Sequence, residues 1–246
     1  MLGPAFVRGT AQPFRRAASL ELVVYLAFHR RRLRHADWAS ALWPDRPVSP
    51  ATVNSTASDA RRALGRSSAG APLLPRGTHL LLHESVSSDV DRFSALARRG
   101  EPEALVAALR LVRGPVFTGL RRVDWSVLDG TRSSIESLVV DAALRGADAL
   151  IECGRAGEAE WVVRRGLVVS PFEERLYRAL LRATAARANR VGLRAAMDHL
   201  LALAGEKAPA RGTDTTRLTC LDPETTALYR DLLGGVPATG DLAARR

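Results

Sequence analysis

The chain has 246 residues, of which 46% are apolar, and its formal net charge is +10. This length and apolar content allow one large or two ordinary domains with a buried core, and they exclude a disordered chain. Cys153 and Cys220 are too few for a disulfide framework and lack CxxC spacing, which indicates reduced thiols.

No segment predicts contact with a membrane. The longest apolar stretch, Leu20–Phe28, contains Glu21 and is too short to span a bilayer. The first residues lack the charged region and apolar stretch of a signal peptide, and no long basic amphipathic helix is evident. We therefore expect a cytoplasmic protein.

The positive charge is concentrated in the first third of the chain. Residues 1–88 contain 12 arginines and 5 acidic residues, whereas the rest has a net charge of only +3. Because Lys207 is the only lysine, a GC-rich genome explains many of the arginines as well as phosphate contacts would. The uneven placement nevertheless favours a polyanionic partner.

Three helices with short strands are predicted in residues 1–88. Residues 2–7 and the region near Phe14 predict a β-hairpin that turns at Gly9. Apolar residues then recur at helical spacing over 17–29, and a second helix is expected over 36–43, before Pro44.

The third helix, 49–64, has the clearest boundaries. Ser49 is a good N-cap, Pro50 suits the first helical position, and Gly65 suits the residue after the end. The predicted buried stripe is Val53, Ala57, Ala60 and Leu64. The predicted polar face is Thr52, Asn54, Ser55, Ser58, Asp59, Arg61 and Arg62.

Residues 73–83 predict two short strands around Arg76-Gly77. Three helices followed by such a hairpin have the order of a winged helix-turn-helix, whose third helix enters the major groove of DNA. The candidate DNA-binding residues are Arg16, Thr52, Asn54, Ser55, Ser58, Arg61, Arg62, Arg76 and His79.

Each of these residues also has a structural explanation. The helix face could be a solvated surface on which Arg61 or Arg62 pairs with Asp59, and Arg16 and Arg76 could simply be exposed. Asn54 suits adenine, and Arg61 and Arg62 suit guanine or phosphate. His79 and His83 alternate with leucines, so strand positions explain them better than metal ligation.

From Asp89 to about Leu233 the pattern is helical throughout. Helices are expected from Asp89, from Pro102, and over 125–152, 156–169, 172–188, 191–204 and 222–233, with a loop over 206–221. Shifting 154–167 by 34 residues aligns it with 188–201, a period typical of tetratricopeptide-like repeats. The expected fold class is mainly α, with domains at 1–88 and 89–234 and a disordered tail at 235–246.

No catalytic, cofactor or metal motif is present. The pattern GxxxxGK[ST] is excluded because Glu206 and Ala208 flank the only lysine, and HExxH, GxSxG and metal-spaced Cys/His groups are absent. The sequence therefore predicts a protein that is not an enzyme and binds no cofactor.

Several segments together resemble one family of regulators. In the first domain these are Leu42–Asp45 and Ala60–Gly65; in the second they are Asp89…Phe93, Ala108–Pro115, Gly154-Arg155, Ser170–Glu174 and Leu221–Pro223. Their order resembles regulators of the Streptomyces antibiotic regulatory protein type, in which an OmpR-like winged helix precedes a bacterial transcriptional activator domain. The resemblance extends to about Leu233.

The resemblance implies binding to double-stranded DNA, often as a side-by-side pair on direct repeats, and contact with RNA polymerase. It implies that the helical repeats form a homodimer or receive a signal, such as a peptide or small-molecule effector. Such modules also occur at the C-terminal end of longer actinobacterial proteins, and the resemblance leaves that arrangement open here.

Two positions depart from the family pattern. The family usually has a basic residue where this chain has Asp59, which we expect on the face toward DNA, and Gly-Tyr-Arg-Leu where it has Gly77–Leu80. These changes favour an alternative function, a protein-interaction or ligand-sensing module whose winged helix does not recognise DNA.

Overall fold

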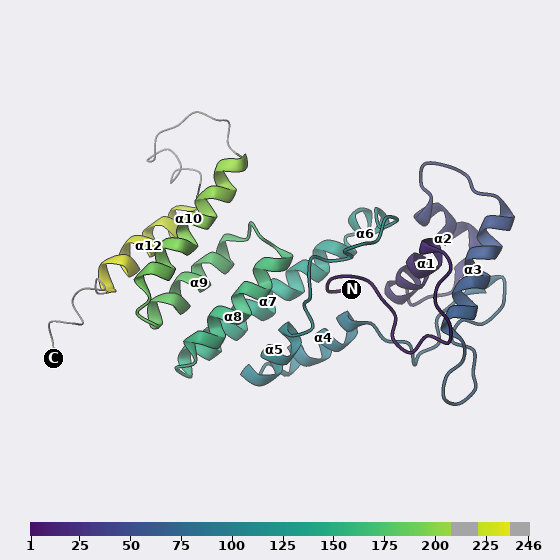
Figure 1. Cartoon of the computed structure of the whole chain (residues 1–246), viewed down its shortest axis with the longest axis horizontal. Helices are drawn as coiled ribbons and strands as arrows, with labels where there is room; N and C mark the ends of the chain where they lie inside the picture. Colours follow the sequence, from purple (N-terminus) through teal and green to yellow (C-terminus); the bar gives the residue numbers. More distant parts are fainter. Residues whose placement is uncertain (208–220, 237–246) are drawn as a thin grey trace. The chain divides into compact units, whose positions relative to one another are not determined.

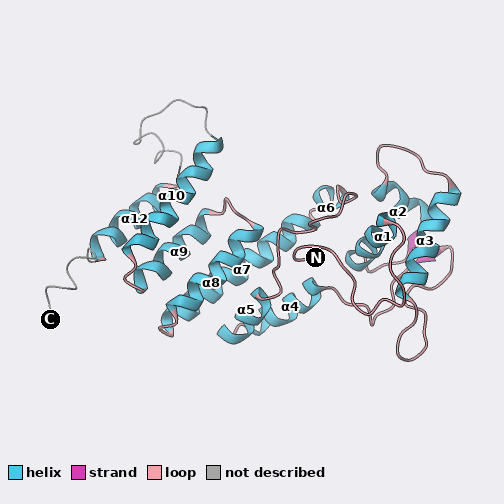
Figure 2. Cartoon of the chain, viewed as in Figure 1, coloured by secondary structure: helices cyan, strands magenta, loops and turns pink. Residues whose placement is uncertain are grey.

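The computed structural model describes residues 1–207 and 221–236. The expected loop over 206–221 and tail over 235–246 lie almost entirely outside the described residues. The predicted mainly helical fold is confirmed, since the described chain consists of helices, loops and one two-stranded sheet (Figure 2).

The chain divides into two compact units. The first combines residues 1–92 with 113–135, and the second combines residues 93–112 with the chain from Glu136 onward. By contacts, therefore, residues 113–135 belong with the N-terminal part of the chain. The predicted domain boundary at residue 88 stays a prediction.

Three helices form the centre of the first unit, as predicted. They are α1 (Ala17–Phe28), α2 (His35–Leu42) and α3 (Pro50–Leu64), and α3 packs against α1 (Figure 1). Trp38 and Leu42 lie four residues apart on α2 and are both buried.

The sheet of the first unit differs from the prediction. Strand β1 (Leu33–Arg34) pairs antiparallel with β2 (His79–Leu80), so His79-Leu80 does form a strand but pairs across 45 residues. The predicted partner strand near Leu73 is absent from the described chain; the loop 73–83 is closed by one hydrogen bond, from the His83 N–H to the Leu73 carbonyl (2.9 Å). Leu33 and Leu80 are fully buried, so the side chains of this cross-strand pair are part of the core of the unit.

The predicted N-terminal hairpin is wrong. Residues 2–14 form no strand in the structure. Their backbone pairs instead with residues 113–118: the Arg113 N–H donates to the Leu2 carbonyl (2.7 Å), and the Ala5 N–H donates to the Thr118 carbonyl (3.3 Å). The Leu2 side chain is fully buried, and this burial stabilises the long-range arrangement over a local turn at Gly9.

Residues 113–135 are attached to α1 by a buried carboxylate. Glu21 of α1 is 2% exposed, and its Oε1 accepts the backbone N–H groups of Arg121 (2.9 Å) and Arg122 (3.3 Å). Its Oε2 accepts a charged hydrogen bond from the Arg122 guanidinium at 2.7 Å. Three donors thus compensate a charge that would otherwise be costly to bury.

Aromatic packing reinforces the same attachment. Trp125 opens the short helix α6 (Trp125–Leu128) and meets Tyr25 edge-on, with ring centroids 5.1 Å apart. Phe117 packs edge-on against Phe28 at 5.3 Å, although its φ of 61° is unusual for a bulky residue. Such a backbone conformation costs about 1–3 kcal/mol and requires tight packing to persist.

The second unit is a series of packed helices. Its elements are α4 (Asp89–Arg99), α5 (Pro102–Leu109), α7 (Thr131–Glu152), α8 (Ala156–Val169), α9 (Glu174–Ala186), α10 (Arg190–Lys207) and α12 (Pro223–Gly235), of which α4 and α7 also contribute residues to the first unit. Helix α9 packs against α8, α10 and α12 (Figure 1). Helices α8 and α10 start 34 residues apart, at Ala156 and Arg190, in agreement with the sequence period.

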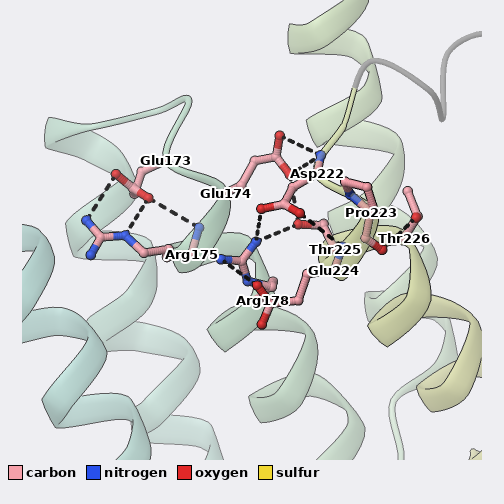
Figure 3. A network of polar contacts seen from close by, with 9 residues as sticks. All are labelled: Glu173, Glu174, Arg175, Arg178, Asp222, Pro223, Glu224, Thr225 and Thr226. Atoms are coloured by element: carbon pink, nitrogen blue, oxygen red, sulfur yellow. Dashed lines mark hydrogen bonds and ion pairs between the residues drawn. The ribbon is translucent and has the colours of Figure 1, made fainter.

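A polar network attaches α12 to α9 (Figure 3). Arg178 of α9 is only 13% exposed and donates to Asp222 (3.2 Å) and to the Thr225 hydroxyl (2.9 Å). Glu174, one turn earlier, accepts the Thr225 hydroxyl at 2.7 Å and the Asp222 N–H at 3.0 Å. Asp222 also caps α12 by accepting the Glu224 N–H.

Replacing Glu21 tests how residues 113–135 are held. Glu21→Ala leaves two backbone donors and a guanidinium without their acceptor, so we expect it to lower the free energy of unfolding of the first unit by about 3 kcal/mol. Trp38, Trp43 and Trp125 lie in this unit, so urea unfolding followed by tryptophan fluorescence measures the change.

Glu84→Ala is the matched control for Glu21→Ala. Glu84 is an exposed glutamate of the same unit, in the loop before α4, so the loss should stay below about 1 kcal/mol. Equal stability losses in the two variants would contradict the anchoring role of Glu21.

Replacing Arg178 tests how α12 is attached. Arg178→Ala removes the shared donor of the network, so the backbone amides of residues 223–235 should exchange with deuterium faster, by about tenfold. Arg182→Ala, one turn further along α9, is the control because Arg182 is 46% exposed and lies 3.6 Å from Asp148. Unchanged exchange in Arg178→Ala would show that apolar packing alone holds α12.

Candidate DNA-binding face

Helix α3 begins and ends as its sequence predicts. The Ser49 hydroxyl accepts the Thr52 N–H at 3.3 Å. Pro50 occupies the first turn, where a backbone N–H would have no partner within the helix, so the missing N–H of proline costs no hydrogen bond. Gly65 follows the last residue with a φ of +75°, which an L side chain rarely adopts. This 15-residue helix therefore has defined ends.

Burial divides α3 into two faces. The predicted core stripe is confirmed, with Val53, Ala57, Ala60 and Leu64 all at most 8% exposed. Opposite to it, Ala51, Asn54 and Ser58 are exposed, and Thr52, Ser55, Arg61 and Arg62 are partly exposed. Seven of the nine candidate residues thus belong to α3 or to the segment beside it, and the other two lie in the loop 73–83.

Asp59 corrects the prediction, because it does not lie on the exposed face. It is 7% exposed, and one carboxylate oxygen accepts the backbone N–H groups of Arg15 (3.1 Å) and Arg16 (3.2 Å). Its other oxygen forms an ion pair with Arg62. Arg16 is the N-cap residue of α1 and provides no side-chain cap. Asp59 binds the backbone of this residue and of the one before it, and its negative charge is favourable at the N-terminal end of α1.

The surroundings of Asp59 favour its charged form. Burial by itself would raise the pKa of Asp59, but hydrogen bonds from Ser19 and Arg62 and from the Arg15 backbone outweigh burial and hold the pKa below its ordinary value. The carboxylate is therefore ionised and internally compensated at neutral pH.

The segment before α1 runs along the side of α3. The Ala11 N–H donates to the Ala63 carbonyl (2.8 Å), and the Gln12 side chain accepts from Arg62 at 3.1 Å. Further along, the Arg16 guanidinium donates to the Ser55 hydroxyl at 2.7 Å. Two predicted site residues, Arg16 and Ser55, are thus brought into direct contact on the exposed side.

Arg61 lies beside the loop 73–83. Its Nε donates to the Pro75 carbonyl at 3.3 Å. Burial and the neighbouring charge of Arg76 both lower the pKa of Arg61, although a guanidinium stays charged at any physiological pH. Arg76 itself is exposed at the tip of the loop. These two candidate residues therefore form one cationic end of the face.

His79 pairs through its backbone with Arg34, and its exposed side chain contacts the Thr78 hydroxyl at 3.0 Å. Burial lowers the pKa of His35 at the start of α2, and the neighbouring Arg61 and His79 lower it further. His79 is therefore an ordinary strand residue, as the alternative interpretation of the sequence held. Its exposed side chain belongs to the same loop as Arg76.

Sequence reasoning missed Gln12 and the inward position of Asp59. A helical wheel offered one signal: position 59 lies beside Ala60 and Ala63, both fully buried, and not opposite to them. No pattern indicated Gln12, because its contact with Arg62 spans 50 residues of an irregular segment.

The described residues hold no group of three or more His, Cys, Asp or Glu side chains suited to a metal ion. Within the same part of the chain, none of the helices combines the length and apolar character needed to cross a bilayer. The exposed polar side chains of α3 and of the loop 73–83 are hydrogen-bonding and cationic groups.

Comparison with known proteins agrees with this architecture. Residues 87–192 match the family of the bacterial transcriptional activator domain. Over 201 residues the chain is 27% identical to the transcriptional regulatory protein MoaR1 of Mycobacterium tuberculosis and to that of Mycobacterium bovis, covering 74% of this chain and 64% of each relative. The chain thus spans just under two thirds of the length of these relatives.

A solved structure matches nearly the whole chain. The structure of Mycobacterium tuberculosis EmbR in complex with a low-affinity phosphopeptide superposes with a TM-score of 0.64 and 25% identity, covering 99% of this chain and 66% of EmbR. These matches confirm the resemblance, seen in the sequence, to regulators of the Streptomyces antibiotic regulatory protein type.

Replacing Asp59 tests whether its buried carboxylate stabilises the first unit. We expect Asp59→Asn to lower the free energy of unfolding by about 1–3 kcal/mol at pH 7, because the ion pair with Arg62 is lost. Since the folded pKa of Asp59 lies below its ordinary value of 3.8, this stability is present above pH 3.8 and is lost as pH falls through the folded pKa.

The difference between wild type and Asp59→Asn should therefore shrink below about pH 4. Urea unfolding at a series of pH values measures it, with Asp45→Asn, an exposed position in the loop before α3, as the control. A difference that did not change with pH would argue against an ionised Asp59 in the folded chain.

Proposed function

We propose that this protein regulates transcription by binding double-stranded DNA, with α3 in the major groove and the loop 73–83 against the backbone. The observation that carries the proposal is the burial of Asp59. It is the only acidic residue of α3, and its inward position leaves the exposed face of the helix free of negative charge.

The distribution of side chains suits a DNA-binding helix. Uncharged polar residues occupy the N-terminal half of the exposed face, where a recognition helix meets base edges. Arginines lie at its edges: Arg16 beside Ser55, Arg62 in the last turn, and Arg76 in the loop. Cations in such positions contact phosphates and set the register of the protein on the duplex.

The burial of Asp59 also weakens the alternative of a winged helix that does not recognise DNA. That alternative rested on an acid facing the phosphates and on the unusual residues of the loop, and the first reason does not hold for this structure. Thr78 remains, and its hydroxyl is a hydrogen-bonding group that repels no phosphate.

For the second unit we propose a role in binding partners and no catalytic role. Packed helical repeats present extended surfaces suited to a peptide, a small molecule or a second copy of the chain. The phosphopeptide in the EmbR complex supports a peptide effector as the first to test. A homodimer, contact with RNA polymerase, a cytoplasmic location and the domain boundary at residue 88 are parts of the same proposal.

Reversing the charge of Arg76 tests the DNA-binding proposal. Arg76 is exposed, so Arg76→Glu should not affect folding, but it should lower affinity for every duplex sequence by about tenfold at low salt. The slope of log affinity against log salt should fall by about 0.9 for the phosphate contact removed. Fluorescence anisotropy with a labelled promoter fragment across a salt series measures both quantities.

Arg194→Glu is the matched control, because Arg194 is an exposed arginine on α10 of the second unit and the change in net charge is identical. It should retain most of the affinity. Wild-type protein that showed no salt-sensitive binding at low ionic strength would refute the proposed function and leave the interaction module as the better description.

A further inference from the structure

The arginines around α3 are already engaged within the protein. Arg62 contacts both Gln12 and the buried carboxylate of Asp59. Turning Arg62 toward a base would remove the counter-ion of a carboxylate that is 7% exposed, and such a loss is strongly destabilising. Arg62 is therefore better suited to stay in place beside the phosphates than to recognise guanine.

The other two arginines lie at the margins of the face. Arg16 enters from the segment before α1 and its guanidinium donates to Ser55. Arg61 points to the loop 73–83, where it donates to the Pro75 carbonyl. The centre of the exposed stripe is thus left to short uncharged side chains.

Asn54 is the one side chain on this stripe that can form two hydrogen bonds to a single base edge. It is exposed in the N-terminal half of α3, and its amide makes no hydrogen bond within the described residues. An amide offers one donor and one acceptor side by side, which matches N7 and the N6 amino group of adenine.

The neighbours of Asn54 allow the close approach that its short side chain needs. Ala51, three residues before, and Ser58, four residues after, are the adjacent positions on the same exposed stripe. Neither extends beyond Asn54, so no large side chain holds the helix away from the floor of the groove. The methyl group of Ala51 is also suited to contact a thymine methyl group.

We propose that Asn54 recognises an adenine in the major groove through N6 and N7, and that it is the main base-specific contact of α3. This inference rests on the proposed function and adds to it a residue and the base it selects. The flanking arginines then supply affinity without sequence preference.

Selection from a random duplex pool, followed by sequencing, tests the inference with the full chain. Wild type should select sites with one position at which adenine is preferred by about tenfold or more over each other base. Asn54→Ala should lose the preference at that position only, with an unchanged salt slope, and it should fold because alanine favours an exposed helix position.

Two further measurements identify the contact itself. Replacing the selected adenine by 7-deazaadenine, which lacks the N7 acceptor, should weaken binding by wild type and leave binding by Asn54→Ala unchanged. Asn54→Asp should shift the preference toward cytosine, because a carboxylate accepts from the N4 amino group and cannot donate to N7.

Ser133→Ala, at an exposed position on α7 outside the candidate face, is the control and should keep the adenine preference. If Asn54→Ala selected the same bases as wild type, the inference would be wrong while the proposed function stood. If wild type bound DNA with salt dependence but without any base preference, the inference would fail in the same way. Absence of DNA binding by wild type would overturn both.

Discussion

A buried carboxylate joins the two helices on which the winged helix depends. Asp59 of α3 accepts two backbone N–H groups at the start of α1 and pairs with Arg62 on its own helix. The position of α3 relative to α1 is therefore set by charge-assisted hydrogen bonds as well as by apolar contact. Because the same residue faces inward, the bonds that fix the helix also remove the only negative charge from its outer face.

Local patterns in the sequence were sufficient to predict most helices of this fold. The caps of α3 at Ser49 and Gly65, the buried stripe through Ala57 and Ala60, and the 34-residue spacing of α8 and α10 depend on contacts within a few residues or on a regular repeat. Capping and helix amphipathicity act over that range, so these elements can be recognised from the sequence.

The errors share a physical origin, which is pairing between distant segments. In place of the predicted hairpin, residues 2–14 form backbone hydrogen bonds with residues 113–118. Strand β2 likewise pairs with the distant Leu33–Arg34. Asp59 was assigned to the polar face by residue type, although its position on the helix is beside Ala60. A charged residue is an ambiguous signal, because it can be exposed or buried with partners that the local sequence does not reveal.

The helix α1 is therefore held from two sides by two different carboxylates. Asp59 reaches its N-terminus from α3, while its own Glu21 binds the backbone at residues 121 and 122. Residues 113–135 lie inside the segment that matches the activator-domain family, yet by contacts they belong to the first unit. The family boundary in the sequence and the boundary of the folded unit thus differ. The candidate DNA-binding helix consequently rests on a framework to which part of the activator-domain sequence contributes, through Glu21 and the aromatic packing of Trp125 and Phe117.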